Sequence, residues 1–308
     1  NLIQLEIREK NLKGSSFYID SFFNLMKPRV MSLVLFTCMV GLVIAPKEVS
    51  ILNSIFSLIA VALGAGAAGT LNMWYESDLD ALMSRTCLRP IPTGQVTKKQ
   101  AFLFGILLSA VSVTLLYFSS NLMSAILLLF TIFFYFFVYT VWLKRRTPQN
   151  IVIGGAAGAL PPAIGWTIAT GTLTIEPIIL FFIIFLWTPS HFWALSLYKS
   201  DDYKKANIPM LPNIYGVNTT KKNIFVYSLL MLPVISLPYI INFLSVFYFL
   251  PTLALTVYYI YLCGTLLRSK NKTSNNLIAR KIFLYSIFYL FFIFLLILLD
   301  HFITNFYG

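Results

Sequence analysis

Long apolar stretches alternate with short polar ones along the whole chain. About nine stretches of roughly 18 to 25 residues are mostly apolar, which is the length that a helix needs to cross the hydrocarbon of a bilayer. This pattern predicts an all-α polytopic membrane helical bundle, with residues 1–26 as an N-terminal segment and residues 27–308 as a single intramembrane domain. The expected spans are residues 30–46, 51–74, 101–119, 121–143, 151–170, 174–198, 223–242, 245–267 and 281–303.

Small residues and prolines mark where these helices pack or break. The runs at 64–69 and 154–159 contain only Gly and Ala, and such residues let membrane helices approach each other closely. Because no strand precedes either run, we interpret both as helix-packing seams and not as phosphate-binding loops. Pro161 and Pro162 predict a break or kink in the fifth span. The turn at 119–121 is so short that the third and fourth spans must be antiparallel neighbours.

Composition and charge place the chain in a membrane and orient it there. Hydrophobic residues make up 58% of the chain, charged residues 11%, and the mean hydropathy is +0.79. The net charge is +12, but the 23 lysines and arginines are spread over several polar segments. All except Lys47 lie before the first span or after the second, fourth, sixth and eighth spans. The positive-inside rule therefore predicts a cytoplasmic N-terminus and an external C-terminus. Because topology and contact with anionic lipid headgroups account for this charge, we predict no nucleic-acid partner.

Cysteine usage and the first residues add two expectations. Cys38, Cys87 and Cys263 are widely spaced and form no C-x-x-C pair, which argues against a disulfide framework or a zinc site. Residues 1–26 mix acidic and basic residues without an apolar core, unlike a signal peptide or a typical transit peptide. We therefore expect a bacterial plasma (inner) membrane in preference to a mitochondrial inner membrane.

Five of the eleven acidic residues fall in two short segments, each placed where an apolar run meets a basic loop. The first segment contains Asn72, Glu76 and Asp80, whose spacing predicts one shared face of a helix. Carboxylates clustered at the edge of the hydrocarbon are costly to desolvate unless a cation joins them. Mg²⁺ carried in on a diphosphate is such a cation, and Arg85 and Arg89 follow to bind phosphate oxygens.

The second acidic segment is Asp201-Asp202-Tyr203, which follows the sixth span. Both segments are therefore expected at the cytoplasmic face, where they can face each other across a cavity. We favour Asp202 over Asp201 as a ligand because Asp202, like Asp80, opens onto a loop. Ordinary surface charge at the ends of helices is the alternative explanation, although the first segment ends an otherwise uncharged membrane helix.

Longer motifs surround these acids. The most specific are R-T-x-x-R-P at 85–90, H-F-W-A-L at 191–195 and I-P-M-L-P at 208–212, joined by K-P-R at 27–29, Y-T-V-W-L-K-R at 139–145 and N-I-V-I-G-G at 150–155. Together they resemble the protohaem IX farnesyltransferases, or haem O synthases, a family of the UbiA-type intramembrane prenyltransferase superfamily. The resemblance covers about residues 27–216. One departure is Asn207, where the family usually has Gly, and Asn tolerates positive φ better than most residues.

The resemblance implies transfer of a farnesyl group from farnesyl diphosphate to a vinyl group of haem B, which gives haem O and diphosphate. It implies Mg²⁺ as cofactor, and a haem A synthase or terminal oxidase as the partner that receives the product. The implied catalytic residues are Asn72, Glu76, Asp80 and Asp202, which would hold Mg²⁺ through diphosphate, and Arg85, Arg89 and Lys144, which would neutralise the leaving group. Further substrate contacts are expected at Lys27, Arg29, Asp78, Tyr139, Arg145, His191, Asp201 and Tyr203.

Several alternatives stay open. An allylic cation needs electron-rich rings in a water-poor pocket, and candidates near the right depth are Tyr135, Tyr139, Trp142, Phe192 and Trp193. For any one of these rings, packing or an interfacial belt is the commoner role. His191 binds haem in one interpretation and is a hydrogen-bonded structural residue in the other. Two other functions are a prenyltransferase for a quinone precursor or chlorophyllide, and a transporter, although transporters generally place ionisable groups near the midplane.

Overall fold

The structure is a computed structural model that describes residues 15–307, without the side chains of residues 15–18, 29, 30 and 307. This part of the chain contains helices and no strands. Eight segments are long and apolar enough to cross a membrane, and the apolar part of the first predicted span, Met31–Val43, is shorter. The total of nine spans therefore stays a prediction. The helices are α2 (Ser15–Leu25), α3 (Pro28–Val43), α4 (Ile51–Tyr75), α5 (Ser77–Leu82), α6 (Lys98–Ser119), α7 (Leu122–Phe133), the π-helix η1 (Phe134–Leu143), α8 (Asn150–Ala159), α9 (Pro161–Thr170), α10 (Ile175–Tyr198), α11 (Ser200–Lys205), α12 (Leu211–Ile214), α13 (Gly216–Ile240), α14 (Val246–Arg268) and α15 (Lys272–Tyr307).

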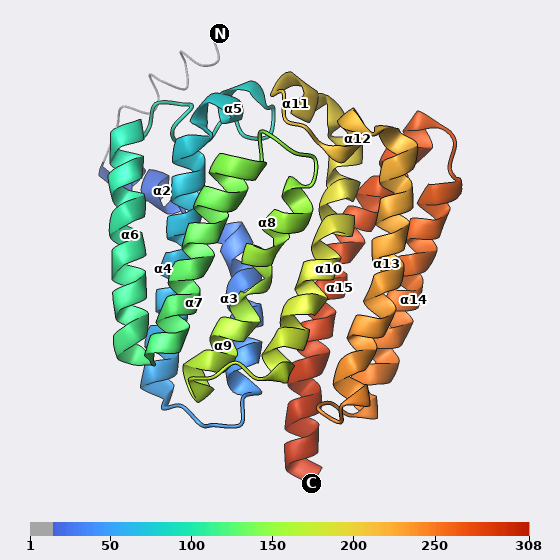
Figure 1. The fold of residues 1–308 in the computed structure, drawn as a ribbon. Coiled ribbons are helices and arrows are strands. Elements are labelled where there is room, and N and C mark those ends of the chain that lie inside the picture. The colour runs from blue at the N-terminus through green and yellow to red at the C-terminus, as the bar shows by residue number, and fades with distance from the viewer. Residues whose placement is uncertain (1–14, 308) are drawn as a thin grey trace.

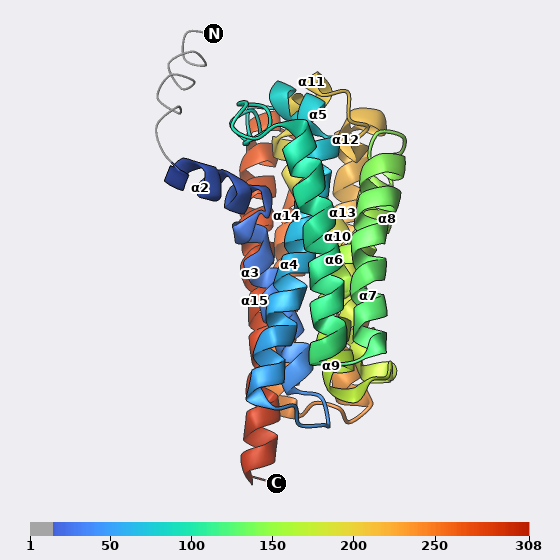
Figure 2. The ribbon, with the colours of Figure 1, turned by 90° about the vertical axis from the view of Figure 1, so that its left-hand side faces the viewer.

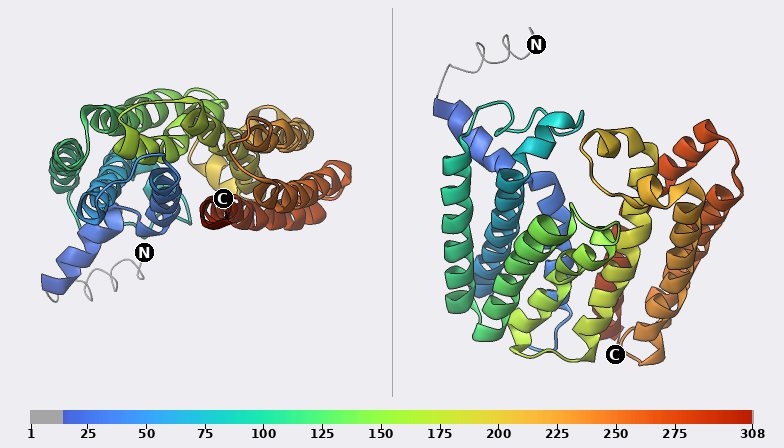
Figure 3. Two further views of the ribbon diagram at one scale, coloured as in Figure 1. Left: turned by 90° about the horizontal axis from the view of Figure 1, so that it is seen from below. Right: turned by 45° about the horizontal axis from the view of Figure 1, so that its top comes forward.

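The long helices form two groups that stand side by side (Figures 1 and 3). One apolar core lies among α3, α4, α6, α7 and α9, and a larger one is centred on α10, α13, α14 and α15. Helix α3 packs on α9 and also contacts α15, so it joins the two groups. Helices α5 and α11, which carry acidic residues from the two segments, lie at the same end of the bundle, opposite the C-terminal end of α15 (Figure 1).

Helix α2 lies beside the bundle near this end, at an angle to the other helices (Figure 2). Phe22 packs against Phe104 of α6, with ring centroids 4.9 Å apart. Between α2 and α3, Lys27 has a left-handed backbone, with φ 57 and ψ 58, and Pro28 opens α3. The sharp change of direction brings the Lys27 side chain toward the end of α4.

Small residues set the closest contacts between helices, as the sequence predicts. A Cβ added to Gly165 of α9 would lie 1.9 Å from the carbonyl oxygen of Cys38 in α3. The two backbones can therefore approach this closely only because residue 165 has no side chain. Other glycines whose added Cβ would be crowded are Gly41 by Pro162, Gly64 by Leu128, and Gly154 by Tyr139.

Three of the predicted helices are interrupted. Helix α4 ends at Tyr75, so the single helix that the spacing predicts through Asp80 is wrong. The fourth span changes from α-helix to π-helix at Phe134, which the apolar pattern does not predict. The fifth span breaks before Pro161, as its prolines predict.

The seventh and ninth predicted spans are too short, since α13 begins at 216 and α15 covers 272–307.

Candidate functional site

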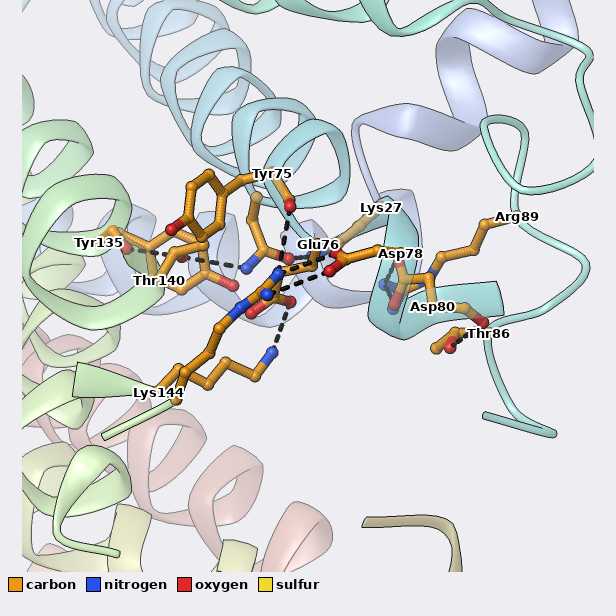
Figure 4. A network of polar contacts seen from close by, with 12 residues as sticks. Lys27, Tyr75, Glu76, Asp78, Asp80, Thr86, Arg89, Tyr135, Thr140 and Lys144 are labelled. Atoms are coloured by element: carbon orange, nitrogen blue, oxygen red, sulfur yellow. Dashed lines mark hydrogen bonds and ion pairs between the residues drawn. The ribbon is translucent and has the colours of Figure 1, made fainter. Parts of the chain in front are cut away.

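The candidate site begins where α4 bends into α5. Glu76 lies at the bend, with φ −95 and ψ 11, between Asn72 in α4 and Asp80 in α5. The amide of Glu76 donates to the Asn72 carbonyl at 3.0 Å, and the amide of Asp80 donates to the Glu76 carbonyl at 2.8 Å. These bonds keep helical spacing across the bend, and all three residues are at most 3% exposed. The three predicted residues therefore follow one another at helical spacing although no single helix carries them. Figure 4 shows Glu76 and Asp80 near this bend.

Glu76 forms a buried ion pair with Lys144, which follows the π-helix. The Lys144 Nζ lies 2.5 Å from Glu76 Oε2. The amide of Lys144 donates to the Tyr139 carbonyl, five residues earlier, at 2.9 Å. This wider π-type turn directs Lys144 toward α4, and such turns are frequent at functional sites. The other carboxylate oxygen, Glu76 Oε1, is buried and has no hydrogen-bond donor in the described part of the chain.

Asn72 is held from two sides. Lys27 donates to its Oδ1 at 2.6 Å, and its Nδ2 donates to Thr140 Oγ1 at 3.0 Å. Thr140 in turn donates to the Tyr135 carbonyl at 2.9 Å within η1. Burial and the charge of Arg89 lower the pKa of Lys27 to about 7. No motif singled out Thr140, because a lone threonine in an apolar segment does not reveal which element it faces.

Asp80 is paired with Arg89 from the following loop. The Arg89 NH1 lies 2.8 Å from Oδ1 and 2.7 Å from Oδ2 of the carboxylate. Thr86 donates to the Asp80 carbonyl at 3.0 Å, which folds the R-T-x-x-R loop back onto α5. Because the Asp80 side chain is 5% exposed, removing its arginine would leave a buried and uncompensated charge.

Asp78 and Arg145, both predicted to contact substrate, form an ion pair at the rim of the site. Arg145 donates to the two carboxylate oxygens of Asp78 at 3.0 and 2.8 Å, and its guanidinium lies 5.2 Å from the Tyr75 ring. Burial acts to raise the pKa of Asp78, but the hydrogen bond and charge of Arg145, together with backbone hydrogen bonds, lower the pKa on balance. Both side chains are exposed, so solvent screens the pair and it contributes little to stability.

The second acidic segment meets the first through Asp202. Ser84, in the loop after α5, donates to Asp202 Oδ2 at 2.8 Å, which connects the ends of the two helix groups. Asp202 is half-buried and Asp201 is exposed, and the preference for Asp202 as a ligand stays a prediction. Tyr203 is 6% exposed and belongs to the larger apolar core. No motif pointed to Ser84, which only the folded chain places beside Asp202.

The oxygen atoms at the bend suit a divalent cation. Amide and carboxylate oxygens are the ligands that Mg²⁺ prefers, and the unpartnered Glu76 Oε1 is free to accept one. In the described part of the chain, no three acidic, histidine or cysteine side chains converge as a metal-binding group. The predicted set of metal ligands therefore stays a prediction. Arg85 is exposed at the rim, and the side chain of Arg29 lies outside the described residues.

His191 is buried among aromatic rings in the second helix group. Its Nδ1 lies 2.6 Å from Ser286 Oγ of α15. The imidazole stacks on Trp187, with centroids 4.3 Å apart, and on Phe283, at 4.6 Å. These contacts satisfy the structural interpretation of His191, and its contact with substrate stays a prediction.

Two of the five predicted rings lie at the polar site. The Tyr135 and Tyr139 rings are tilted by 36° with centroids 5.3 Å apart, and Lys144 Nζ lies 5.6 Å from the Tyr139 ring. These rings therefore adjoin the Glu76 ion pair. The other three rings are placed differently. Trp142 is 56% exposed and Phe192 is 38% exposed, whereas Trp193 is buried and packs against Tyr227.

Comparison with known proteins gives a consistent family. The model of the UbiA prenyltransferase family matches residues 34–301. A Pelagibacter ubique protein named protoheme IX farnesyltransferase is 60% identical over 97% of this chain and 99% of its own length. A Bartonella henselae protein of the same name is 49% identical over 94% of this chain and 92% of its own length.

Solved structures share the fold at lower sequence identity. A digeranylgeranylglyceryl phosphate synthase aligns with a TM-score of 0.76 and 19% identity, over 92% of this chain and 98% of its own. A UbiA homologue from Archaeoglobus fulgidus, bound to GPP and Mg²⁺, aligns with a TM-score of 0.65 and 18% identity, over 90% of this chain and 99% of its own. Both structures therefore have the same helical architecture as this chain.

Proposed function

Because the chain belongs to the UbiA prenyltransferase family, and within it to the protohaem IX farnesyltransferases, we propose that it converts haem B and farnesyl diphosphate to haem O. The observation that carries the proposal is 60% identity to a protein of that name over 97% of the chain. The buried cluster of oxygen and basic side chains at one end of the bundle supports it, since a prenyl diphosphate needs both.

Across the vinyl double bond the reaction makes one carbon–carbon bond and one carbon–oxygen bond, and it breaks one carbon–oxygen bond in farnesyl diphosphate. The bond between C1 of farnesyl diphosphate and its phosphate oxygen breaks, and C1 bonds to the terminal carbon of a haem vinyl group. Water adds to the inner vinyl carbon and loses a proton, so the products are haem O, diphosphate and a proton. Charge accumulates on the departing diphosphate, where Lys27, Arg89 and Lys144 would stabilise it, with Arg85 at the rim.

Asn72, Glu76, Asp80 and Asp202 would hold Mg²⁺ together with the diphosphate. The ion would neutralise phosphate oxygens and make diphosphate a better leaving group. The buried and unpartnered Glu76 Oε1 supports this assignment. So does the A. fulgidus homologue, which is bound to GPP and Mg²⁺. Substrate contacts are proposed at Lys27, Arg29, Asp78, Tyr139, Arg145, His191, Asp201 and Tyr203.

We place the protein in a bacterial plasma membrane as one intramembrane domain, with the polar site at the cytoplasmic end. The basic residues that flank this end of the bundle support the orientation. Haem O would pass to a haem A synthase or terminal oxidase in the same membrane.

Acceptor identity is the direct test of this function. The purified protein in nanodiscs would receive radiolabelled farnesyl diphosphate, Mg²⁺ and one acceptor at a time: haem B, 4-hydroxybenzoate or chlorophyllide. We expect a labelled product of haem O mass with haem B and background label with the other two. Preferential labelling of a quinone precursor or chlorophyllide would overturn the haem assignment, and ion flux in liposomes without any prenyl transfer would favour a transporter.

A further inference from the structure

The three predicted metal ligands at the α4–α5 bend each hold a basic side chain from another part of the chain. These basic groups come from the α2–α3 link, the end of η1 and the loop after α5, and all reach the same small cluster (Figure 4). The pairs are Lys27 with Asn72 at 2.6 Å, Lys144 with Glu76 at 2.5 Å, and Arg89 with Asp80 at 2.7 Å.

Burial makes these pairs compete with a metal ion. The side chains of Glu76 and Asp80 are only 2% and 5% exposed, so each carboxylate needs a counter-charge within the protein. A divalent cation arriving alone would take that carboxylate and leave a lysine or arginine unpaired beside a doubly positive ion. Like charges at such distances repel strongly where water is scarce. The metal alone therefore has poor access to these carboxylates.

A diphosphate removes the obstacle, because its oxygens offer the displaced basic groups a new partner. Lysine and arginine both bind phosphate oxygens, and the long Lys144 side chain keeps 16% of its surface exposed. Glu76 Oε1 is buried without a donor and provides a first contact for the metal while Oε2 still holds Lys144.

We propose that the site loads by charge exchange: Lys144 and Arg89 hold Glu76 and Asp80 while the site is empty, and both move to the diphosphate when a divalent cation takes the carboxylates. The same two basic side chains thus serve the empty and the loaded state. This inference rests on the proposed function only in that its ligand is a diphosphate. Metal and diphosphate then bind with strong mutual dependence, and each tightens the other by the same factor.

Metal binding measured without any reaction tests the exchange. Equilibrium dialysis of Mn²⁺ against the protein in nanodiscs, at matched free Mn²⁺, would be run with and without inorganic pyrophosphate. We expect pyrophosphate to tighten Mn²⁺ binding by about tenfold or more. Lys144→Met should bind Mn²⁺ alone more tightly than the wild type, because Glu76 is freed, and should lose most of the pyrophosphate effect. Arg89→Gln tests the Asp80 pair in the same way, and Lys47→Gln, at the opposite end, is the matched control.

Opposite signs separate the exchange from purely structural ion pairs. If Lys144→Met and Arg89→Gln weaken Mn²⁺ binding or leave it unchanged, or if pyrophosphate has no effect on the wild type, the exchange is wrong. Each variant tests its own ion pair. One variant with the wild-type elution profile and melting transition is therefore enough to decide whether the exchange occurs. The dialysis contains no farnesyl acceptor, so its result does not depend on the reaction. A protein that shows the exchange here but makes no haem O in the acceptor test would overturn the proposed function and leave the exchange standing.

Discussion

At the residue scale, the site depends on side chains held in costly positions. Lys27 has a left-handed backbone, which costs a non-glycine residue on the order of 1 kcal/mol or more. Its Nζ bonds Asn72, and Pro28 fixes the start of α3. The K-P-R motif marked Lys27 as a candidate, but only the folded chain shows that it faces Asn72.

Lys27 should make pyrophosphate binding pH-dependent. Its pKa is lowered from the ordinary 10.5 to about 7, so the ammonium that attracts an anion is lost as the pH rises above that value. We expect the metal-free affinity for pyrophosphate to fall between about pH 6 and about pH 9, relative to Lys27→Arg, which stays charged. Titration calorimetry measures this affinity for both proteins, and the comparison cancels the pH dependence that comes from the ionisation of pyrophosphate itself. Parallel curves of affinity against pH for the two proteins would contradict this prediction.

The same shift has the opposite sign for stability. Between pH 7 and 10 the unfolded chain binds more protons at Lys27 than the folded chain does. The free energy of unfolding therefore rises with pH over this range, as the cost of burying a charged Lys27 is removed. Below about pH 7 that cost is fully present.

Asn207 confirms an expectation made from its residue type, since its φ is 51 and its amide donates to the Lys204 carbonyl at 3.0 Å. Asn207→Gly should leave the free energy of unfolding nearly unchanged, whereas Asn207→Ala should lower it by about 1 kcal/mol, because a Cβ is disfavoured in this conformation. Denaturant unfolding in detergent measures both variants. Equal stability of the Ala and Gly variants would show that the turn relaxes.

At the scale of elements, residue spacing located the acidic motif but not its shape. Asn72, Glu76 and Asp80 keep the helical hydrogen-bond spacing on which the prediction rested. The spacing did not reveal the bend at Glu76, because the residues around the bend carry no proline or glycine. The π-helix at 134–143 was equally hidden, since its aromatic and β-branched residues fit an α-helix as well.

The contact between α3 and α9 gives a prediction for packing. Gly165→Ala would place a Cβ 1.9 Å from a backbone oxygen of Cys38, which cannot turn aside as a side chain can. We expect a loss of about 1–3 kcal/mol in the free energy of unfolding. Gly158→Ala is the matched control, because its added Cβ meets nothing within 4 Å and alanine favours the helix. Similar losses in both variants would mean that helix separation is not the cause.

At the scale of the molecule, the length and order of the apolar segments were enough to predict a helical membrane bundle with both acidic segments at one end. The short turn at 119–121 correctly predicted that α6 and α7 are neighbours. For the other helices the packing partners could not be predicted, because apolar faces in a membrane carry little information about their partners. The division into two groups, and the Ser84–Asp202 hydrogen bond that joins their ends, therefore come from the structure.

The rate of haem O formation by site variants tests most directly whether this end of the bundle performs the transfer. Wild type, Asp80→Asn and Asp202→Asn would be compared in nanodiscs with haem B, farnesyl diphosphate and Mg²⁺, with Glu48→Gln at the opposite end as control. We expect EDTA to abolish the product and each aspartate variant to lose about a hundredfold or more in rate, with the control unchanged. Wild-type rates in both aspartate variants, in folded protein, would place the reaction elsewhere.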